Sequence, residues 1–246
     1  MSTAPERLEV VPEDWQRALA VVAHPDDLEY GAAAAVARWT GQGRQIAYCL
    51  ATSGEAGIGS MPPEQAGPVR EAEQRAAAAV VGVSDVEFLG LPDGVLEYGL
   101  PLRRAIATAV RRHRPEVVIG LSHRQAAVGD PPDQADHIAV GRATIDAVRD
   151  AANRWVFRDL LDGGLQRWAG VHTVLTVGSP HPTHAVDVTA TFDRGVASLR
   201  EHRAYLEGLG AFGGGSAEFL EVMAREAGER LGVPMAVAFE AIPLRF

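Results

Sequence analysis

ALAVVAHPDDLEYG, residues 18–31, joins a compact apolar run to a turn made of polar and rigid residues. A short apolar run bounded by turn signals is typical of a strand buried on both faces, and such strands belong to parallel sheets covered by helices. Pro25 has no amide hydrogen for the sheet ladder and biases His24 away from helical backbone angles. We therefore expect the strand to end at His24, at the sheet edge where α/β proteins bind their ligands.

The turn after this strand concentrates metal-binding side chains. A helix is expected from about Gly31 to Gly41, and an aspartate at its start would serve as an N-cap. Capping explains one carboxylate but gives no structural role to the adjacent carboxylate or to His24. Imidazole and carboxylate are the usual zinc ligands besides thiolate, and His24 and Asp27, three residues apart in a tight turn, can point at one ion. Asp26 lies between them and is expected to point elsewhere.

Composition narrows the function classes. The 246 residues suit one large α/β domain, and a hydrophobic content of 47% is enough for a buried core. The formal net charge of −9 argues against nucleic acid or an anionic membrane as a partner, because both require a basic surface. The 23 Lys and Arg positions are all arginine, which excludes a P-loop lysine, a pyridoxal Schiff base and a lysine nucleophile.

The single cysteine, Cys49, lies in the second apolar run. It cannot form an internal disulfide, so a core position is expected, with a thiolate metal ligand as the alternative. The N-terminus lacks the apolar segment of a signal peptide, and no run approaches the roughly 18 apolar residues of a membrane span. A cytoplasmic location is therefore expected.

Apolar periodicity and turn residues predict alternating strands and helices. Strands are expected at 18–23, 44–52, 86–89, 116–121, 171–177 and 235–243, and helices at 31–41, 68–82, 100–113, 136–152, 189–207 and 216–231. Residues 153–168 are expected to be irregular or helical, and 208–216 to form a mobile glycine-rich loop, either a lid or a plain connector. The order predicts a Rossmann-like three-layer α/β sandwich with a mostly parallel sheet and helices on both faces. It forms a single domain over 17–246, after a loosely ordered N-terminal lead over 1–16.

Two later segments also follow the carboxyl ends of predicted strands. The loop at 53–63 is rich in glycine and proline and is expected to line the site. Asp93, in the sequence Pro-Asp-Gly after the third strand, matches an ordinary turn when taken alone.

His137 follows a polar loop after the fourth strand and stands in the first turn of the next predicted helix. At that position it would face back toward His24 and Asp27. Three protein ligands with an open position for water distinguish a catalytic zinc site from a structural one. Without further information, a histidine in a first helical turn is more often a surface residue.

Several separated motifs resemble the LmbE/PIG-L family of zinc-dependent N-deacetylases. The family signature, Ala-His-Pro-Asp-Asp after the first strand, stands here at residues 23–27. Similar segments follow in the family's order at 52–57, 70–73, 88–94, 136–137, 187–189 and 201–203. One five-residue motif would be weak evidence, whereas these segments together span most of the chain.

The resemblance implies a hydrolase that removes an N-acetyl or related N-acyl group from an amino-sugar-containing small molecule. It implies one Zn²⁺ per chain, with Fe²⁺ or another divalent ion as alternatives, held by His24, Asp27 and His137. Asp26 is implied to be the general base, which takes a proton from the zinc-bound water and returns it to the leaving amine. The family's counterpart of Asp93 lies near the metal. Relatives are often oligomers, which leaves homo-oligomer formation open.

The chain departs from the family at two positions. The usual His-Pro-Asp-His motif, whose first histidine is thought to stabilise the oxyanion, reads Gln134-Ala-Asp-His137 here. Gln134 can donate a neutral hydrogen bond but carries no positive charge, and losing such a donor costs on the order of 3 kcal/mol in hydrolases. Ser53 stands where many members of the family have arginine.

Other polar residues near the predicted sheet edge are candidates for contacts with the substrate. His184 ranks first as a catalytic replacement for the missing histidine because it precedes the family-like aspartate at 187. His123 and Arg124 are further candidates for that role. Substrate contacts are expected from Glu55, Asp93, His123 and Arg124.

Two alternatives to the deacetylase hypothesis remain open, and two others are excluded by the sequence. Two histidines and one carboxylate also form the facial triad of non-haem iron oxygenases, which usually occupy an antiparallel barrel rather than strand-helix repeats. The departures at Gln134 and Ser53 motivate a second alternative, a degenerate family member that binds metal or sugar without hydrolysis. A serine hydrolase is excluded because no serine lies in a Gly-x-Ser-x-Gly elbow. The glycines at 208, 210 and 213 have dinucleotide-binding spacing, but no strand precedes them.

Overall fold

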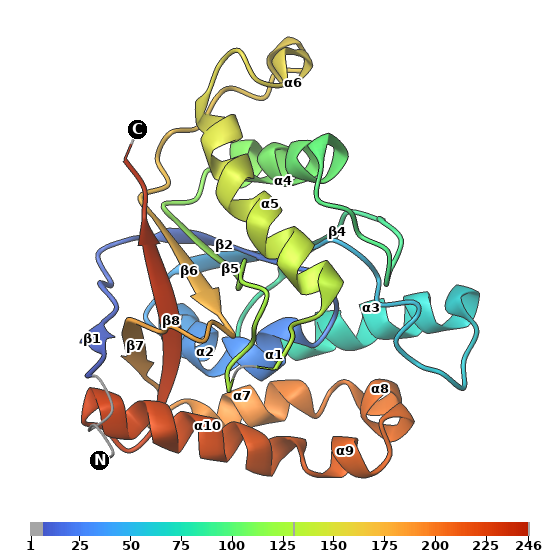
Figure 1. The fold of residues 1–246 in the computed structure, drawn as a ribbon, viewed down its shortest axis with the longest axis vertical. Coiled ribbons are helices and arrows are strands. Elements are labelled where there is room, and N and C mark those ends of the chain that lie inside the picture. Colours follow the sequence, from blue (N-terminus) through green and yellow to red (C-terminus); the bar gives the residue numbers. More distant parts are fainter. Residues whose placement is uncertain (1–6, 130, 246) are drawn as a thin grey trace.

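The strand expected after Gln16 lies near the middle of a mixed sheet in the computed structural model, which describes residues 7–129 and 131–245 (Figure 1). In this part of the chain the sheet has eight strands in the order β1-β7-β8-β6-β5-β2-β3-β4. The strands are β1 Glu9–Val10, β2 Arg17–Val22, β3 Gln45–Leu50, β4 Asp85–Phe88, β5 Val117–Leu121, β6 Thr173–Val177, β7 His184–Asp187 and β8 Ala236–Pro243. β8 is antiparallel to β6 and β7, and the other neighbours are parallel, which confirms the mostly parallel sheet.

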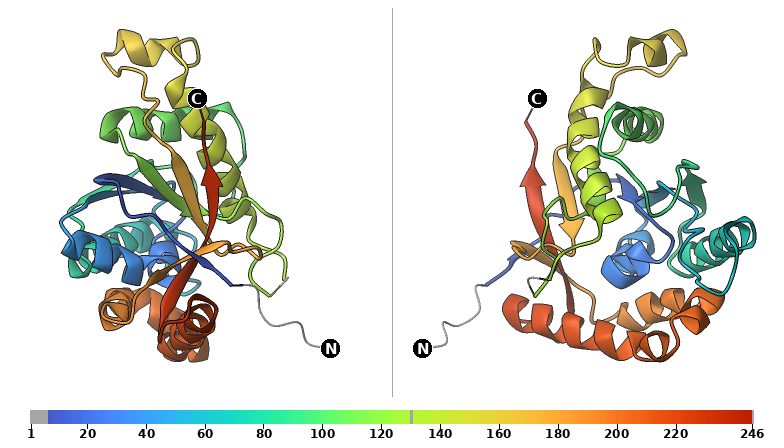
Figure 2. Two further views of the ribbon diagram at one scale, coloured as in Figure 1. Left: turned by 90° about the vertical axis from the view of Figure 1, so that its left-hand side faces the viewer. Right: turned by 45° about the vertical axis from the view of Figure 1, so that its right-hand side comes forward.

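Helices cover both faces of this sheet, as predicted for a three-layer α/β sandwich. They are α1 Asp27–Gly31, α2 Ala33–Gly41, α3 Pro63–Val80, α4 Leu100–His113, α5 Ala135–Ala152, α6 Arg158–Asp162, α7 Phe192–Leu199, α8 Arg203–Gly208, α9 Ala211–Gly214 and α10 Ser216–Leu231. α4 and α5 pack together over β2 on one face. On the other face α1 and α2 lie against the sheet, α7 packs on α2, and α10 packs on β8 (Figures 1 and 2).

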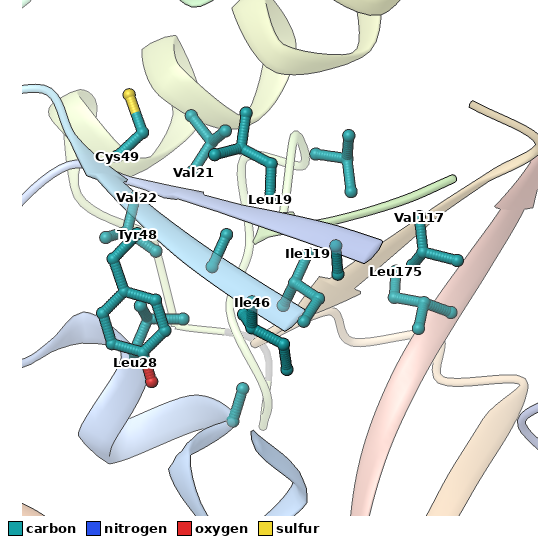
Figure 3. Packing of buried hydrophobic residues seen from close by; sticks show 14 of the residues in the cluster. Leu19, Val21, Val22, Leu28, Ile46, Tyr48, Cys49, Val117, Ile119 and Leu175 are labelled. Carbon is teal, nitrogen blue, oxygen red and sulfur yellow. The ribbon is translucent and has the colours of Figure 1, made fainter. Parts of the chain in front are cut away.

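The central strands are buried on both faces, as their unbroken apolar sequences predict. In β2 every residue from Ala18 to Val22 is at most 3% exposed. Leu19 and Val21 point toward the α5 side, whereas Tyr48 of β3 points toward α1 (Figure 3). Cys49 is a fully buried core residue, and burial raises the pKa of its thiol well above the ordinary value. The expected core position of Cys49 is confirmed.

The segment before β2 is more ordered than the sequence suggested. From residue 7 onward the chain follows the sheet edge, where β1 pairs in parallel with β7. Trp15 is 1% exposed and packs edge-on against Trp39, with ring centroids 5.2 Å apart. The expectation of a loosely ordered lead is therefore wrong for this part. Neither β1 nor β7 was predicted, because each is too short to show a pattern and forms only by pairing with a distant segment.

Several helices differ from their predicted bounds. The first predicted helix is two short helices, interrupted at Ala32, whose φ of −127° is not helical. The third helix begins at Pro63, and Pro68, expected to open it, lies inside it. The helix expected at 189–207 divides into α7 and α8 around His202, which is completely buried beside Glu29. The expected loop at 208–216 contains the short helix α9. Burial of a polar residue, which local sequence does not reveal, explains the break at His202.

No helix in the described part of the chain is both long enough and apolar enough to span a membrane.

Close packing of α5 on the sheet gives a stability prediction. A Cβ added at Gly141 would overlap the carbonyl oxygen of Ser122, at the end of β5, whereas one added at Gly41 meets nothing within 4 Å. Gly141→Ala should therefore lower the free energy of unfolding by about 1–3 kcal/mol through overpacking. Gly41→Ala, also in a helix, should not lower it. Urea denaturation of both variants checks this, and equal stability of the two would contradict the packing described here.

Candidate active site

His24, Asp27 and His137 converge at the carboxyl edge of the parallel strands. His24 lies in the turn between β2 and α1, Asp27 is the first residue of α1, and His137 stands in the first turn of α5. One ligand atom from each lies within 4.8 Å of the other two. Nε2 of His137 is 3.0 Å from Oδ1 of Asp27, and Nδ1 of His24 is 3.8 Å from Oδ2 of Asp27. The predicted ligands are thus brought together from two segments far apart in sequence.

The second nitrogen of each histidine faces a carboxylate. Nε2 of His24 lies 3.0 Å from Asp93 and 3.3 Å from Asp136. Nδ1 of His137 lies 3.1 Å from Asp133. In metal sites, carboxylates in such positions fix the orientation and tautomer of the histidines. Here they leave the other nitrogen of each ring directed at Asp27. His24, Asp93 and Asp136 themselves form a second group of close ligand atoms, which shares His24 with the first.

The electrostatics of this cluster fit a bound cation. Burial alone would lower the pKa of His24, but hydrogen bonds and charges from Asp27 and Asp93 raise it to about 11. Burial opposes protonation of His137 in the same way, yet Asp27 and Asp133 raise its pKa to about 10. Burial would raise the pKa of Asp27, and the two histidines lower it instead. Two imidazoles and one carboxylate in a field that favours positive charge match the donor set of catalytic zinc.

Asp26 lies beside this cluster but turns away from it. Its backbone is in the left-handed region with φ of 88°, which is uncommon for a residue other than glycine and is often found at functional sites. Nη2 of Arg70 donates to its Oδ1 at 2.8 Å, and Tyr205 also hydrogen-bonds its carboxylate. Burial raises the pKa of Asp26 to about 6, against the lowering effect of Arg70. Asp26 therefore lies beside the cluster of His24, Asp27 and His137 without joining it.

A network of buried hydrogen bonds fixes the position of Asp26. The backbone N–H of Asp26 donates to Oε1 of Gln74 at 3.0 Å, and Nε2 of Gln74 donates to Glu29 at 3.1 Å. Glu29 also accepts a hydrogen bond from Ser198 and lies 3.3 Å from Nε2 of His202. These groups come from α1, α3, α7 and the start of α8. The network can keep the strained backbone of Asp26 in one conformation.

Arg70 completes this support. It donates to the carbonyl oxygens of Pro25 at 2.5 Å and Gly54 at 3.1 Å, and its guanidinium lies 4.1 Å from the centre of the Tyr205 ring. A Cβ at Gly54 would overlap this guanidinium, and Gly54 also has a positive φ of 63°. The glycine-rich loop after β3 is therefore shaped around Arg70.

Sequence reasoning assigned no role to several residues of this site. The polar residues behind Asp26 and the carboxylates behind the two histidines were not predicted to act there: Glu29, Arg70, Gln74, His202, Tyr205, Asp133 and Asp136. Arg70, Asp136 and His202 stand in the segments that resemble the LmbE/PIG-L family, which was the available signal for them. Gln74 and Tyr205 gave no such signal, because only their hydrogen bonds to Asp26 distinguish them.

Other predicted residues are divided between the pocket and its surroundings. Gln134 is the N-cap residue of α5 and lines the pocket. Asp93 also lines it, and Oε1 of Glu55 accepts a hydrogen bond from the backbone N–H of Asp93 at 2.9 Å. Arg124 is not among the described lining residues; its Nε donates to Glu240 at 2.9 Å, and Glu240 does line the pocket. His123 is likewise absent from the described lining and is partly buried.

The expected catalytic role of His184 is not supported by its position. His184 is the first residue of β7, at the sheet edge, with Nε2 3.6 Å from Glu9 of β1. It is absent from the pocket lining within the described residues. The prediction rested on sequence proximity to Asp187, but pairing of β7 with β1 turns this histidine toward the edge strand.

One pocket of about 970 Å³ contains the whole cluster. One part of the pocket is lined by His24, Asp26, Asp27, Gln134 and His137. Side chains of α7 and α10 line another part. Its size is near the upper end of the range of about 300–1,000 Å³ that is usual for small-molecule sites.

Comparison with known proteins agrees with this geometry. The family model described as "PIG-L: GlcNAc-PI de-N-acetylase" matches residues 19–148, more than half of the chain. Diacetylchitobiose deacetylase of Thermococcus kodakarensis is 26% identical over 196 residues, which cover 78% of this chain and 70% of the relative. A 1D-myo-inositol 2-acetamido-2-deoxy-alpha-D-glucopyranoside deacetylase of Acidothermus cellulolyticus is 29% identical over 241 residues, covering 79% of this chain and 81% of the relative.

A solved structure shows the same fold. N,N'-diacetylchitobiose deacetylase from Pyrococcus horikoshii aligns with a TM-score of 0.85 and 22% identity, over 94% of this chain and 85% of that one. The family model includes the turn that carries His24 and Asp27 and the helix that carries His137. The chain therefore belongs to the PIG-L family of de-N-acetylases.

Proposed function

We propose that this protein is a zinc-dependent hydrolase that removes an N-acetyl or related N-acyl group from an amino-sugar-containing small molecule. The observation that carries the proposal is the convergence of His24, Asp27 and His137 beside a separate buried carboxylate, Asp26, in one pocket. The named relatives act on acetylated amino sugars, diacetylchitobiose and an acetamido-glucopyranosyl inositol, which supports this substrate class.

The proposed metal ligands are Nδ1 of His24, the Asp27 carboxylate and Nε2 of His137. A bound zinc ion would polarise the amide carbonyl and lower the pKa of the attacking water. Three protein ligands leave a coordination position open, as catalytic zinc requires. The α/β sandwich with a mostly parallel sheet does not favour the iron-oxygenase alternative, whose facial triad usually occupies an antiparallel barrel.

Asp26 is proposed to move the proton. Its carboxylate takes a proton from the attacking water as the new bond forms between the water oxygen and the acyl carbon. It then gives that proton to the amide nitrogen as the carbon–nitrogen bond breaks, which yields a free amine and a carboxylic acid that loses its remaining proton to solvent. Arg70 and Tyr205 hold the carboxylate in place for both transfers.

Gln134 is the proposed donor to the developing oxyanion. It precedes the first turn of α5 and lines the pocket near His137. Its amide N–H can stabilise negative charge, although more weakly than a protonated histidine.

Replacement of Asp26 tests the proton-transfer role. Asp26→Asn keeps the shape of the side chain but removes its basicity, so kcat should fall by about 10²–10⁴-fold while one zinc ion per chain remains bound. Acetate release from N-acetylglucosamine conjugates and metal analysis on the same preparation measure both. Turnover near the wild-type rate would show that Asp26 is not the base.

A pair of histidine variants tests the metal centre. His137→Ala should lose bound zinc and acetate release together, because it removes one of three ligands. His184→Ala, with the same chemical change at the sheet edge, should keep both. Metal content after dialysis against a chelator and acetate release are compared in the two variants. Retention of zinc in His137→Ala, or its loss only in His184→Ala, would refute the proposed ligand set.

Variants of Gln134 test the oxyanion donor. Gln134→Ala should lower kcat by about 10²-fold with a smaller change in KM, because the interaction is made mainly in the transition state. Gln134→His should raise kcat above that of the wild type by restoring a charged donor. Steady-state kinetics separate the two parameters, and an unchanged kcat in Gln134→Ala would assign the donor to another residue. No acetate release by any of these proteins, with zinc bound, would indicate a binding protein without hydrolytic activity.

A further inference from the structure

The pocket extends from the cluster of His24, Asp27 and His137 to a wall of apolar side chains. This apolar wall consists of Phe192, Val196, Leu209, Phe219, Leu220 and Met223. They come from α7, α10 and the residue after α8. In Figure 1 α7 and α10 lie below α1; α7 contacts α1, and α10 packs on β8. The wall and the proposed metal ligands therefore border the same space.

α10 presents this wall because only half of the helix packs against the sheet. Near its C-terminal end Ala227 packs in a cluster with Ala185 of β7 and Ala236 of β8. Near its N-terminal end Phe219 and Met223, four residues apart, point from one face into the pocket. Phe219 remains 53% exposed, and Met223 is partly buried. Apolar area is thus left accessible inside a site rather than buried in the core.

Tyr30 joins the wall to the helix that carries Asp27. Its hydroxyl lies 2.7 Å from Oγ of Ser216, at the start of α10, and its ring centroid is 6.5 Å from that of Phe219. Tyr30 stands one helical turn after Asp27 on α1. The apolar wall therefore begins next to the proposed reaction centre.

The wall suits a group without hydrogen-bonding atoms. Its six side chains offer no strong donor or acceptor, so sugar hydroxyls placed against them would lose their hydrogen bonds to water without replacement. The pocket is also much larger than one acetylated sugar ring requires. From Phe219 to Glu226, where the lining of α10 becomes charged, the helix advances about 10 Å. Successive carbons of an extended alkyl chain, joined by bonds of about 1.5 Å, advance roughly 1.25 Å each, so about eight of them span this length.

We propose that the substrate carries an alkyl chain that lies against the apolar wall, so that the enzyme acts on an amphiphilic N-acylated amino sugar. This inference rests on the proposed hydrolase function. The chain belongs either to the acyl group that is removed or to the group attached to the sugar. All six wall residues follow residue 148, outside the segment that matches the family model, so the wall can differ among proteins that share the metal centre.

Two substrate series test the chain and identify its source. One is glucosamine N-acylated with two to ten carbons, and the other is N-acetylglucosamine with methyl to octyl groups on its anomeric oxygen. In one series kcat/KM should rise about threefold per methylene up to about eight carbons. A rise in the first places the chain in the acyl group, and a rise in the second places it on the sugar. A flat or falling profile in both would overturn the proposal.

Adjacent positions on α10 provide a matched pair of variants. Met223 lines the pocket, whereas Val222 is 54% exposed and is absent from the described lining. Met223→Gln should reduce the ratio of kcat/KM between long-chain and short-chain substrates at least fivefold, because it places an amide against the chain. Val222→Gln should leave that ratio as in the wild type. Equal ratios in the two variants would place the chain elsewhere and refute the role of the wall.

Binding to the zinc-loaded Asp26→Asn protein separates this inference from the hydrolase proposal. Calorimetry should show that octyl N-acetylglucosaminide or N-octanoylglucosamine binds at least tenfold more tightly than methyl N-acetylglucosaminide. Chain-dependent binding without hydrolysis by the wild type would leave the apolar wall supported and the proposed function refuted. Hydrolysis by the wild type without chain-dependent binding would leave the function supported and overturn the role of the wall.

Discussion

The site depends on one carboxylate that has two tasks. Oδ2 of Asp27 accepts hydrogen bonds from the backbone N–H groups of Ala23 and His24, at 3.0 and 2.8 Å, and so closes the turn at the end of β2. Oδ1 of Asp27 lies 3.0 Å from Nε2 of His137 and connects this turn to α5. Without Asp27, two N–H groups at a buried strand end would lack an acceptor, at a cost of about 1–3 kcal/mol each. The turn and the proposed metal centre are therefore one structural unit.

The left-handed backbone at Asp26 gives two adjacent carboxylates different environments. Asp27 faces the two histidines, which lower its pKa and suit it to bind a cation. Asp26 turns toward Arg70, and burial raises its pKa to about 6. The conformation costs energy in a residue other than glycine, and the buried hydrogen bonds of Gln74 and Arg70 offset that cost. Separation of the two environments is what the proposed roles require, with one carboxylate as a ligand and the other as a base.

The two parts of the pocket come from different parts of the chain. The proposed metal ligands lie on the carboxyl edge of the parallel strands, within the segment that matches the family model. The apolar wall comes from α7, α10 and the residue after α8; α7 packs on α1 and α2, and α10 packs on β8. Evolution of such a protein can change the wall without changing the edge of the sheet. This arrangement is consistent with a common reaction and a substrate preference that is particular to this chain.

The sequence by itself determined the central layer of the fold and the chemical character of the site. The unbroken apolar run before His24 can only be a strand covered on both faces, and its abrupt end in His, Pro and two Asp places ligands at the edge of the sheet. These signals are local, because the period of the side chains and the backbone limits of Pro25 act within a few residues. The sequence also predicted, through its resemblance to a family, that His137 would join His24 and Asp27.

Only the tertiary structure decided which other groups face this site. His184 seemed suitable in sequence, but its strand pairs at the sheet edge and turns it toward Glu9. Conversely, Gln74 and Tyr205 became neighbours of Asp26 only when α3 and α8 packed beside α1. The segment that forms α10 likewise has only the sequence pattern of an amphipathic helix. Packing decided that half of this helix faces the pocket and contributes to the apolar wall. Such contacts depend on long-range packing, which no local pattern of residues encodes.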